Sequence, residues 1–311
     1  MNAPQWTLDE IPDLSGKRAL VTGVTSGIGA HTVLELARKG AEVVMAARDD
    51  VKLKGAMDDV HRVLPRAVLV PLSLDLADLG SVRRAAEEAG RLGPLDILVN
   101  NAGVMATPHR RTVDGFELQL GTNHLGHFAL TGLLWPQLVA AERARVVTVS
   151  SQMHRMARTV PLTDPRHDTG RRYQKWVAYA ESKLANLLFA FELERRARAA
   201  GSSVQSLAAH PGYARTNLQR TGPGMGGGTS HTAILLGATR LLGQPSEMGA
   251  LPTLMAATMA GLPGGSYVGP RGPMESRGMP TVVRASKVAN DPELARRLWA
   301  VSEEATRVHF P

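Results

Sequence analysis

The 311-residue sequence contains no cysteine. This absence excludes disulfides, thiolate zinc sites and cysteine nucleophiles, although it says little about the cellular compartment. Long uncharged apolar runs are also missing, since the stretch at 233–242 is too short to span a bilayer. The first residues are polar and lack the apolar core of a signal peptide. We therefore expect a cytoplasmic protein without a membrane span.

Charge of one sign is not concentrated anywhere in the chain. Lysine and arginine outnumber aspartate and glutamate by 36 to 28 but are scattered along the whole sequence, so we expect no nucleic-acid partner. The net charge of +8 fits a solvated surface or attraction for a phosphorylated ligand. The apolar share of 43% is ordinary for a globular protein. A single domain over residues 1–311 is the simplest organisation at this length.

Short β-branched runs alternate with amphipathic stretches along the chain. The stretch 28–39 ends at Gly40, where a helix stop belongs, and the stretch 81–90 opens on Ser81 as a cap. This alternation predicts a doubly wound parallel sheet with helices on both faces, in three α/β/α layers, whose ligands bind beyond the carboxyl ends of the strands. The predicted strands are 19–22, 42–46, 68–71, 97–100, 146–150 and 204–209.

A glycine-rich turn follows the first predicted strand. Residues 22–29 read Thr-Gly-Val-Thr-Ser-Gly-Ile-Gly, where the chain must turn sharply from strand to helix. The glycines permit that turn and let backbone N–H groups approach a pyrophosphate. A lone glycine-rich turn is as often without such a function, but here it has the required strand before it and helix after it. The expected dinucleotide contacts are Gly23, Thr25, Ser26, Gly27, Ile28 and Gly29.

A tyrosine and a lysine stand one helical turn apart at Tyr179 and Lys183, hence on one face of a helix. A free tyrosine ionises near pH ~10, so it is a poor base at neutral pH unless a positive charge such as that of Lys183 stabilises the phenolate. In isolation such a pair is more often an incidental feature of a surface helix. Here a predicted buried strand upstream ends in Ser150 and Ser151, at the sheet edge where ligands bind.

Taken together, the ordered motifs from Leu14 to Thr216 resemble the short-chain dehydrogenase/reductase family. They are the Gly-x-x-x-Gly-x-Gly turn, Asn-Asn-Ala-Gly at 100–103, the serine after the fifth strand, Tyr-x-x-x-Lys, and His-Pro-Gly at 210–212. The resemblance implies a Rossmann-type fold and nicotinamide-dependent hydride transfer between a carbonyl and an alcohol. It also implies that Tyr179 moves the proton, while Lys183 lowers the tyrosine pKa and bonds the nicotinamide ribose.

The resemblance carries site residues over position by position. The implied catalytic set is Asn123, Ser151, Tyr179 and Lys183, in which Ser151 holds the substrate oxygen and Asn123 stabilises a helix distortion and a water beside the lysine. A capping role is the alternative for Asn123, as it is for Asp75. The implied cofactor contacts beyond the glycine turn are Asp75, Leu76, Asn101, Ala102, Gly103, Tyr179, Lys183, Pro211, Gly212 and Thr216.

The interval between Ser151 and Tyr179 is longer than is usual in the family. An insert of about 152–176, rich in arginine and histidine, fills it. With Asn-His-Leu-Gly-His-Phe at 123–128 and Ser-Lys-Leu-Ala-Asn at 182–186, the chain resembles the retinol dehydrogenase, protochlorophyllide reductase and WW-domain oxidoreductase branch. That branch acts on bulky apolar alcohols and carbonyls. The alternative is a cofactor-binding sensor or scaffold without turnover, which the intact catalytic set argues against.

The residues after the second strand favour NADP(H), with NAD(H) as the alternative. An NAD site places a carboxylate at this strand end, whereas a 2′-phosphate calls for a cation. Ala47 occupies the carboxylate position, and Arg48 follows with a planar fork that suits a phosphate. Asp49 complicates the argument because it stands near the separation expected for a ribose-binding acid. Ser26 also replaces the basic residue that some NADP-dependent members carry.

Three further features bear on ligands and partners. Residues 217–244 include a glycine-rich run at 221–230 and are expected to form a mobile lid over the substrate, with a disordered surface loop as the alternative. His124 and His127 have no third ligand apparent, so we expect packing roles and assign no metal. The expected partner is a small-molecule alcohol or carbonyl, and self-association is left open because homo-oligomers are common in the family.

Overall fold

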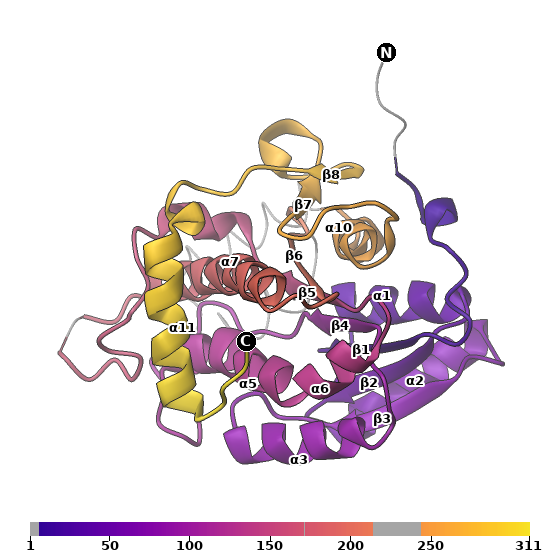
Figure 1. Cartoon of the computed structure of the whole chain (residues 1–311), viewed down its shortest axis with the longest axis horizontal. Coiled ribbons are helices and arrows are strands. Elements are labelled where there is room, and N and C mark those ends of the chain that lie inside the picture. Colours follow the sequence, from indigo (N-terminus) through magenta and orange to yellow (C-terminus); the bar gives the residue numbers. More distant parts are fainter. Residues whose placement is uncertain (1–5, 171, 214–243) are drawn as a thin grey trace, which may run out of the picture.

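The computed structural model describes residues 6–170, 172–213 and 244–311. Its centre is an eight-stranded sheet in the order β3-β2-β1-β4-β5-β6-β7-β8, with helices on both sides (Figure 1). Neighbouring strands run parallel, except that β8 is antiparallel to β7. The strands are β1 (Arg18–Thr22), β2 (Glu42–Ala47), β3 (Leu69–Ser73), β4 (Ile97–Asn100), β5 (Arg145–Val149), β6 (Gln205–Ala209), β7 (Tyr267–Pro270) and β8 (Pro280–Val282).

The predicted doubly wound sheet is confirmed. All six predicted strands form, with ends shifted by at most one or two residues. Leu20 of β1 pairs with Val44 of β2 on one side and with Leu98 of β4 on the other, so the strand order reverses at β1. A ligand crevice is expected at such a reversal, at the carboxyl ends of the strands. The short strands β7 and β8 were not predicted.

The helices form the two outer layers. They are α1 (Gly27–Arg38), α2 (Asp50–Val63), α3 (Leu79–Gly90), α4 (Leu118–Leu120), α5 (Gly126–Leu133), α6 (Trp135–Ala140), α7 (Lys175–Ala199), α10 (Ser246–Thr258) and α11 (Pro292–Thr306). Because strand side chains alternate between faces, Ala19 and Val21 of β1 share a core with α1, α2 and α10. Leu20 instead shares a core with α3, α5, α6 and part of α7. The three-layer arrangement follows from this alternation.

Helix ends show one confirmed prediction and one error. Helix α1 ends at Arg38 just before Gly40, whose φ of 92° suits glycine, as predicted. The predicted cap of the third helix at Ser81 is wrong. The helix begins earlier, and the carboxylate of its N-cap, Asp78, accepts a hydrogen bond from the Gly80 N–H at 2.8 Å. The Ser81 hydroxyl instead accepts from the Asp75 N–H at 3.0 Å.

Residues 152–176, the expected insert, start as a short 3-10 helix, η3 (Gln152–Met156), and the described residues at 157–170 and 172–174 form no helix or strand before α7. The Tyr173 hydroxyl lies 3.0 Å from Glu117 Oε1, and the Glu117 N–H donates to the Pro165 carbonyl at 3.0 Å. These contacts fix the segment against the chain between β4 and α5. Thr216 and residues 217–243 of the expected lid lie outside the described residues. Within the described ranges, no helix combines the length and the apolar character needed to cross a membrane.

Candidate active site

The glycine turn between β1 and α1 leaves the first turn of α1 open to an anion. Gly23 and Gly27 have φ values of 72° and 63°, which favour glycine. A Cβ on Gly23 would lie 2.8 Å from Ala102 Cα, and one on Gly29 would overlap the Gly23 carbonyl oxygen. The N-cap residue Ser26 makes no side-chain capping bond, so the N–H groups of this first turn remain available as donors. This geometry fits a dinucleotide pyrophosphate.

Thr22 ties the glycine turn to the end of β4. Its hydroxyl oxygen accepts from the N–H groups of Asn101 and Ala102, both at 3.0 Å, and lies 2.9 Å from His127 Nε2. His127 Nδ1 lies 3.0 Å from the Asn123 carbonyl, which can only accept, so Nδ1 carries the proton and the Thr22 hydroxyl donates to Nε2. Burial lowers the pKa of His127 to about 4, which keeps this ring neutral. The His127 ring therefore holds the Thr22 hydroxyl in place at the glycine turn.

A π-helical turn, η2 (Gly121–Leu125), carries Asn123. The Asn123 amide accepts from the Val104 N–H at 2.7 Å and donates to the Val104 carbonyl and the Ser182 hydroxyl, both at 2.9 Å. A Cβ on Gly103 would lie 2.9 Å from Asn123 Oδ1 and 3.6 Å from Lys183 Nζ. The helix distortion implied by the family resemblance is present, and the Asn123 side chain ties it to the β4 loop and to α7.

Helix α7 brings Tyr179 and Lys183 to the carboxyl end of β5. Both side chains are buried, and Lys183 Nζ lies 5.8 Å from the centre of the Tyr179 ring. Lys183 Nζ also donates to the Val149 carbonyl at 3.1 Å, while the Ser150 hydroxyl donates to the Lys183 carbonyl at 2.7 Å. Ser151 follows the strand; its hydroxyl accepts from the Met153 N–H at 3.2 Å and lies close enough to Tyr179 to affect its pKa. The structure thus gathers Ser151, Tyr179 and Lys183 at one place.

Burial dominates the electrostatics of this group. It raises the pKa of Tyr179 to about 12, although the hydrogen bond from Ser151 opposes the rise. Burial also lowers the pKa of Lys183 to about 8. The lowering of the tyrosine pKa expected from Lys183 is therefore not the net outcome in this structure. At neutral pH Tyr179 holds its proton, as a proton donor to a carbonyl must.

The ends of β2 and β3 place the residues expected near the adenosine. Arg48 is exposed directly after β2, and within the described ranges its guanidinium has no hydrogen-bond or ion-pair partner. Asp49 caps α2, because its carboxylate accepts from the Lys52 N–H and pairs with Lys52 Nζ, both at 3.0 Å. The Asp75 carboxylate accepts from the Ala77 N–H at 2.9 Å and so closes the turn before α3, whose N-cap is Asp78. Leu76 is buried beside it.

The turn after β6 contains Pro211 and Gly212. Gly212 has a φ of 63°, and a Cβ there would lie 2.5 Å from the Ser276 carbonyl oxygen. The Tyr213 N–H donates to that same carbonyl at 2.7 Å, and Gln244 Nε2 donates to the Pro211 carbonyl at 2.7 Å. The turn is thus held against the β7–β8 loop.

Several polar residues of the site could not be assigned their contacts from the sequence. The sequence marks Thr22 only as the first residue of the glycine turn. Its one signal is a threonine at the end of an apolar strand, and the structure shows it buried. His124 and His127 are both buried, and the His124 ring bonds the Ser302 hydroxyl at 2.8 Å. Among the described residues, no three histidine, cysteine or acidic side chains gather as a metal ion would require. Glu275 carried no sequence signal at all.

Comparisons with known proteins agree with this geometry. The family model for short chain dehydrogenase matches residues 17–161. Human retinol dehydrogenase 13 is 40% identical over 304 residues, which cover 96% of this chain and 87% of that protein. Mouse polyprenol dehydrogenase is 41% identical over 306 residues, covering 93% of this chain and 84% of that protein.

Solved structures give the same result. A protein from Mycobacterium paratuberculosis superposes with a TM-score of 0.81 at 44% identity, covering 99% of this chain and 100% of that one. A structure from Beutenbergia cavernae with bound NADP superposes with a TM-score of 0.63 at 25% identity, covering 82% of this chain and 95% of that one. This chain therefore belongs to the short-chain dehydrogenase/reductase family of oxidoreductases.

Proposed function

We propose that this chain interconverts a carbonyl and an alcohol on a bulky apolar molecule, with NADP(H) as the preferred cofactor. The observation that carries the proposal is the placement of the half-buried Ser151, at the end of β5, beside the buried Tyr179, with Lys183 one turn further along α7. A protein that only binds a cofactor has no need for a transferable proton at this place. The group lies at the carboxyl end of β5, where a doubly wound sheet binds its ligands.

The chain's own residues suit the proton half of the reaction. When bound along the glycine turn, NADP(H) would supply or accept the hydride. Tyr179 holds a proton at neutral pH and would give it to the substrate oxygen, which the Ser151 hydroxyl orients. The Lys183 charge reduces the cost of the phenolate that remains on Tyr179. Oxidation of the alcohol uses the same groups in reverse.

Two observations support a lipophilic substrate. The relatives named retinol dehydrogenase 13 and polyprenol dehydrogenase are named for large apolar alcohols, and each matches more than nine tenths of this chain. In addition, the segment 152–176 begins directly after Ser151 and is ordered against the chain between β4 and α5. Additional chain directly after Ser151 supports the proposal of a bulky substrate.

The cofactor preference rests on Arg48. Its guanidinium is exposed without a protein partner in the described ranges, whereas the carboxylate of Asp49 already caps α2. Ala47 at the end of β2 offers no carboxylate to a ribose. The bound NADP in the Beutenbergia cavernae structure also supports a phosphorylated cofactor.

We expect Arg48→Ala to weaken NADPH binding and to leave NADH binding nearly unchanged. A lost charge-assisted bond to the 2′-phosphate is worth about 1.5–3 kcal/mol, which corresponds to a rise of about 10- to 150-fold in the NADPH Kd. Titration calorimetry with each cofactor measures this. Arg62→Ala is a matched control, because Arg62 is an exposed arginine of α2 that pairs with Asp59 at 2.9 Å. Equal losses for both cofactors, or a wild type that prefers NADH, would move the ribose contact to Asp49.

A carbonyl panel tests the function. Purified protein is mixed with NADPH and with all-trans-retinal, a long-chain isoprenoid aldehyde or a small hydrophilic aldehyde, and the absorbance of the reduced nicotinamide is followed. We expect turnover, with a higher kcat/KM for the two apolar aldehydes. The sensor or scaffold alternative would be favoured if the protein binds NADPH tightly but oxidises it with none of the aldehydes and reduces NADP+ with none of the matching alcohols.

A further inference from the structure

The loop between β7 and β8 holds one glutamate in an unusual backbone conformation. Met274 and Glu275 both have left-handed φ values, 51° and 54°. Such values are uncommon for residues other than glycine and persist where the surroundings determine them. Met274 is 90% exposed, so its side chain does not fix the loop. Backbone bonds within the loop, such as that from the Glu275 N–H to the Gly272 carbonyl at 2.9 Å, and the side-chain contacts of Glu275 hold this conformation.

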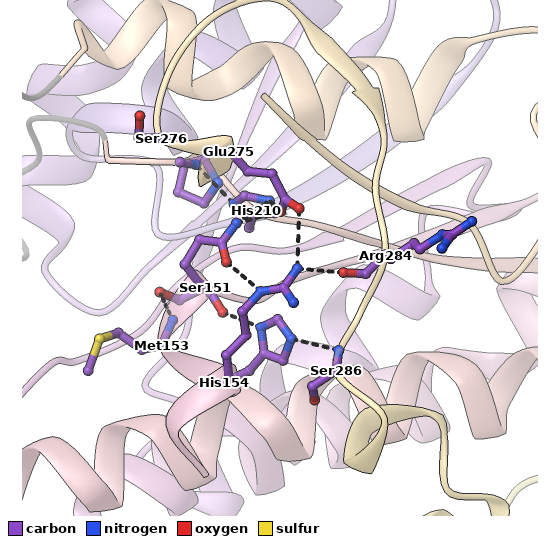
Figure 2. A network of polar contacts seen from close by, with 12 residues as sticks. Ser151, Met153, His154, His210, Glu275, Ser276, Arg284 and Ser286 are labelled. Carbon is purple, nitrogen blue, oxygen red and sulfur yellow. Dashed lines mark hydrogen bonds and ion pairs between the residues drawn. The ribbon is translucent and has the colours of Figure 1, made fainter. Parts of the chain in front are cut away.

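The Glu275 carboxylate is the common acceptor of three donors (Figure 2). Oε2 accepts from His210 Nε2 at 3.1 Å and from the Gln152 side-chain amide. Oε1 accepts from Arg155 Nη2 at 3.2 Å, and Arg155 Nε in turn donates to Gln152 Oε1 at 2.8 Å. The hydrogen bond from His210, together with those from Gln152 and Arg155, keeps the pKa of Glu275 below its ordinary value. The carboxylate is therefore charged at neutral pH.

His210 is held in one tautomer. The Gly212 N–H donates to His210 Nδ1 at 3.2 Å, so the proton of the neutral ring sits on Nε2 and points to Glu275. Burial lowers the pKa of His210, which keeps the ring neutral despite the nearby carboxylate. A Cβ on Gly269 of β7 would overlap the His210 ring, so this strand admits the ring only with a glycine. The His210 side chain therefore has one place and one orientation.

The network joins the two segments that follow the neighbouring strands β5 and β6. One is the start of η3, where Gln152 directly follows Ser151. The other is the turn His210–Tyr213, which contains the Pro211–Gly212 pair and is also bonded to the β7–β8 loop through Ser276. The Glu275 carboxylate bonds both segments, and the Gln152 side-chain amide also lies 3.4 Å from His210 Nε2. It reaches neither Tyr179 nor Lys183 among its hydrogen bonds and ion pairs in the described ranges.

We propose that Glu275 is a positioning residue that sets the distance between the Ser151 hydroxyl and the turn flanking the nicotinamide. The proposal rests on the proposed function, because it takes Ser151 as the substrate-orienting group and Pro211–Gly212 as the nicotinamide wall. A hydride passes only when donor carbon, acceptor carbon and the oxygen held by Ser151 are aligned, and small misplacements are costly. The adenosine end of the cofactor, at β2 and the glycine turn, is outside the network.

The test compares Glu275→Ala and Glu275→Gln with wild type, using NADPH and all-trans-retinal. We expect Glu275→Ala to lower kcat by about 10- to 100-fold. The NADPH Kd should change by less than about threefold, because the glycine turn is untouched. The kinetic isotope effect with NADPH deuterated at the transferred position should rise, because hydride transfer becomes slower than the other steps. Glu275→Gln keeps one carbonyl acceptor, so its kcat should lie between those of wild type and Glu275→Ala.

Two readouts are independent of turnover. At saturation, nicotinamide emission of bound NADPH should be weaker in Glu275→Ala than in wild type, because the ring is less restrained. In the cofactor-free protein, amide hydrogen exchange should accelerate in both 151–156 and 210–213. Glu293→Ala is the matched control, since Glu293 makes an exposed pair with Arg296 on α11 at 2.7 Å, and it should change none of these values.

An unchanged kcat in Glu275→Ala would overturn the proposal. So would a lower kcat with an unchanged isotope effect and unchanged nicotinamide emission, which would show only a loss of folded protein. Failure of the proposed function looks different, because wild type itself would then reduce no aldehyde. In that case accelerated exchange in both segments and weaker emission would still support the positioning role, and their absence would still contradict it.

Discussion

Tyr179→Phe is expected to bind NADPH with wild-type affinity and to lose most of its turnover. The substitution keeps the buried ring but removes the hydroxyl that lies beside Ser151 and carries the proton. Proton transfer by a positioned group contributes about 10²–10⁴ to the rate, so kcat should fall by that factor. Steady-state kinetics on an accepted aldehyde, with NADPH affinity measured separately, gives both values.

Tyr173→Phe is the matched control for this change. It also removes a partly buried tyrosine hydroxyl, one that lies 3.0 Å from Glu117 Oε1 in the segment 152–176. This hydroxyl also accepts from Gln119 Nε2 at 2.8 Å and lies 3.1 Å from the Thr107 carbonyl, so we expect a loss of stability of about 1–3 kcal/mol and little change in kcat. Near wild-type turnover in Tyr179→Phe would remove Tyr179 from the mechanism.

Lys183→Met is expected to stabilise the cofactor-free protein while it removes most of the activity. Burial lowers the pKa of Lys183 from 10.5 to about 8, so the folded state holds a charge at a free-energy cost. At about 1.36 kcal/mol for each pKa unit, the substitution should raise the free energy of unfolding at pH 7 by about 3 kcal/mol. The Val149 carbonyl keeps a donor, Asn186 Nδ2 at 3.0 Å. The buried Lys183 would thus lower the stability of the cofactor-free protein while it serves the reaction.

The stabilisation by Lys183→Met should depend on pH in one direction. Below pH 8 the lysine is charged in both states, and the folded state carries the full cost of the buried ammonium. Between pH 8 and 10.5 the folded state loses its proton first, so the cost declines and is absent above 10.5. Urea unfolding at pH 7 and at pH 10 measures the difference. If Lys183→Met raises the free energy of unfolding by the same amount at both pH values, the result would contradict a charged, buried Lys183.

The parts of the fold that follow from local pattern could be predicted. Alternating strands and helices gave the doubly wound sheet, because buried parallel strands and amphipathic crossovers have separate periodicities. Gly40 marked a true helix end. The cap at Ser81 failed because Asp78 offers a carboxylate one turn earlier, where the chain already leaves the extended conformation. The short β7 and β8 contain glycine and proline, which hide the strand pattern.

The site was predictable where its residues share one helix or one turn. The spacing of Tyr179 and Lys183 fixes their common face before any tertiary contact forms. Their pKa values could not be predicted, because burial on α7 depends on the sheet, η3 and α11 packing around it. Glu275 could likewise not be predicted, since its partners Gln152 and His210 follow β5 and β6, which become neighbours only in the folded sheet.

The most direct test of the central claim follows the hydride itself. Wild-type protein in excess is mixed with NADPH deuterated at the transferred position and an apolar aldehyde such as all-trans-retinal, and the product alcohol is analysed by mass spectrometry. We expect one deuterium on the former carbonyl carbon within a single turnover and almost none with Tyr179→Phe over the same time. Bound, intact NADPH with no deuterated alcohol from wild type would contradict the assignment of this site as a carbonyl reductase.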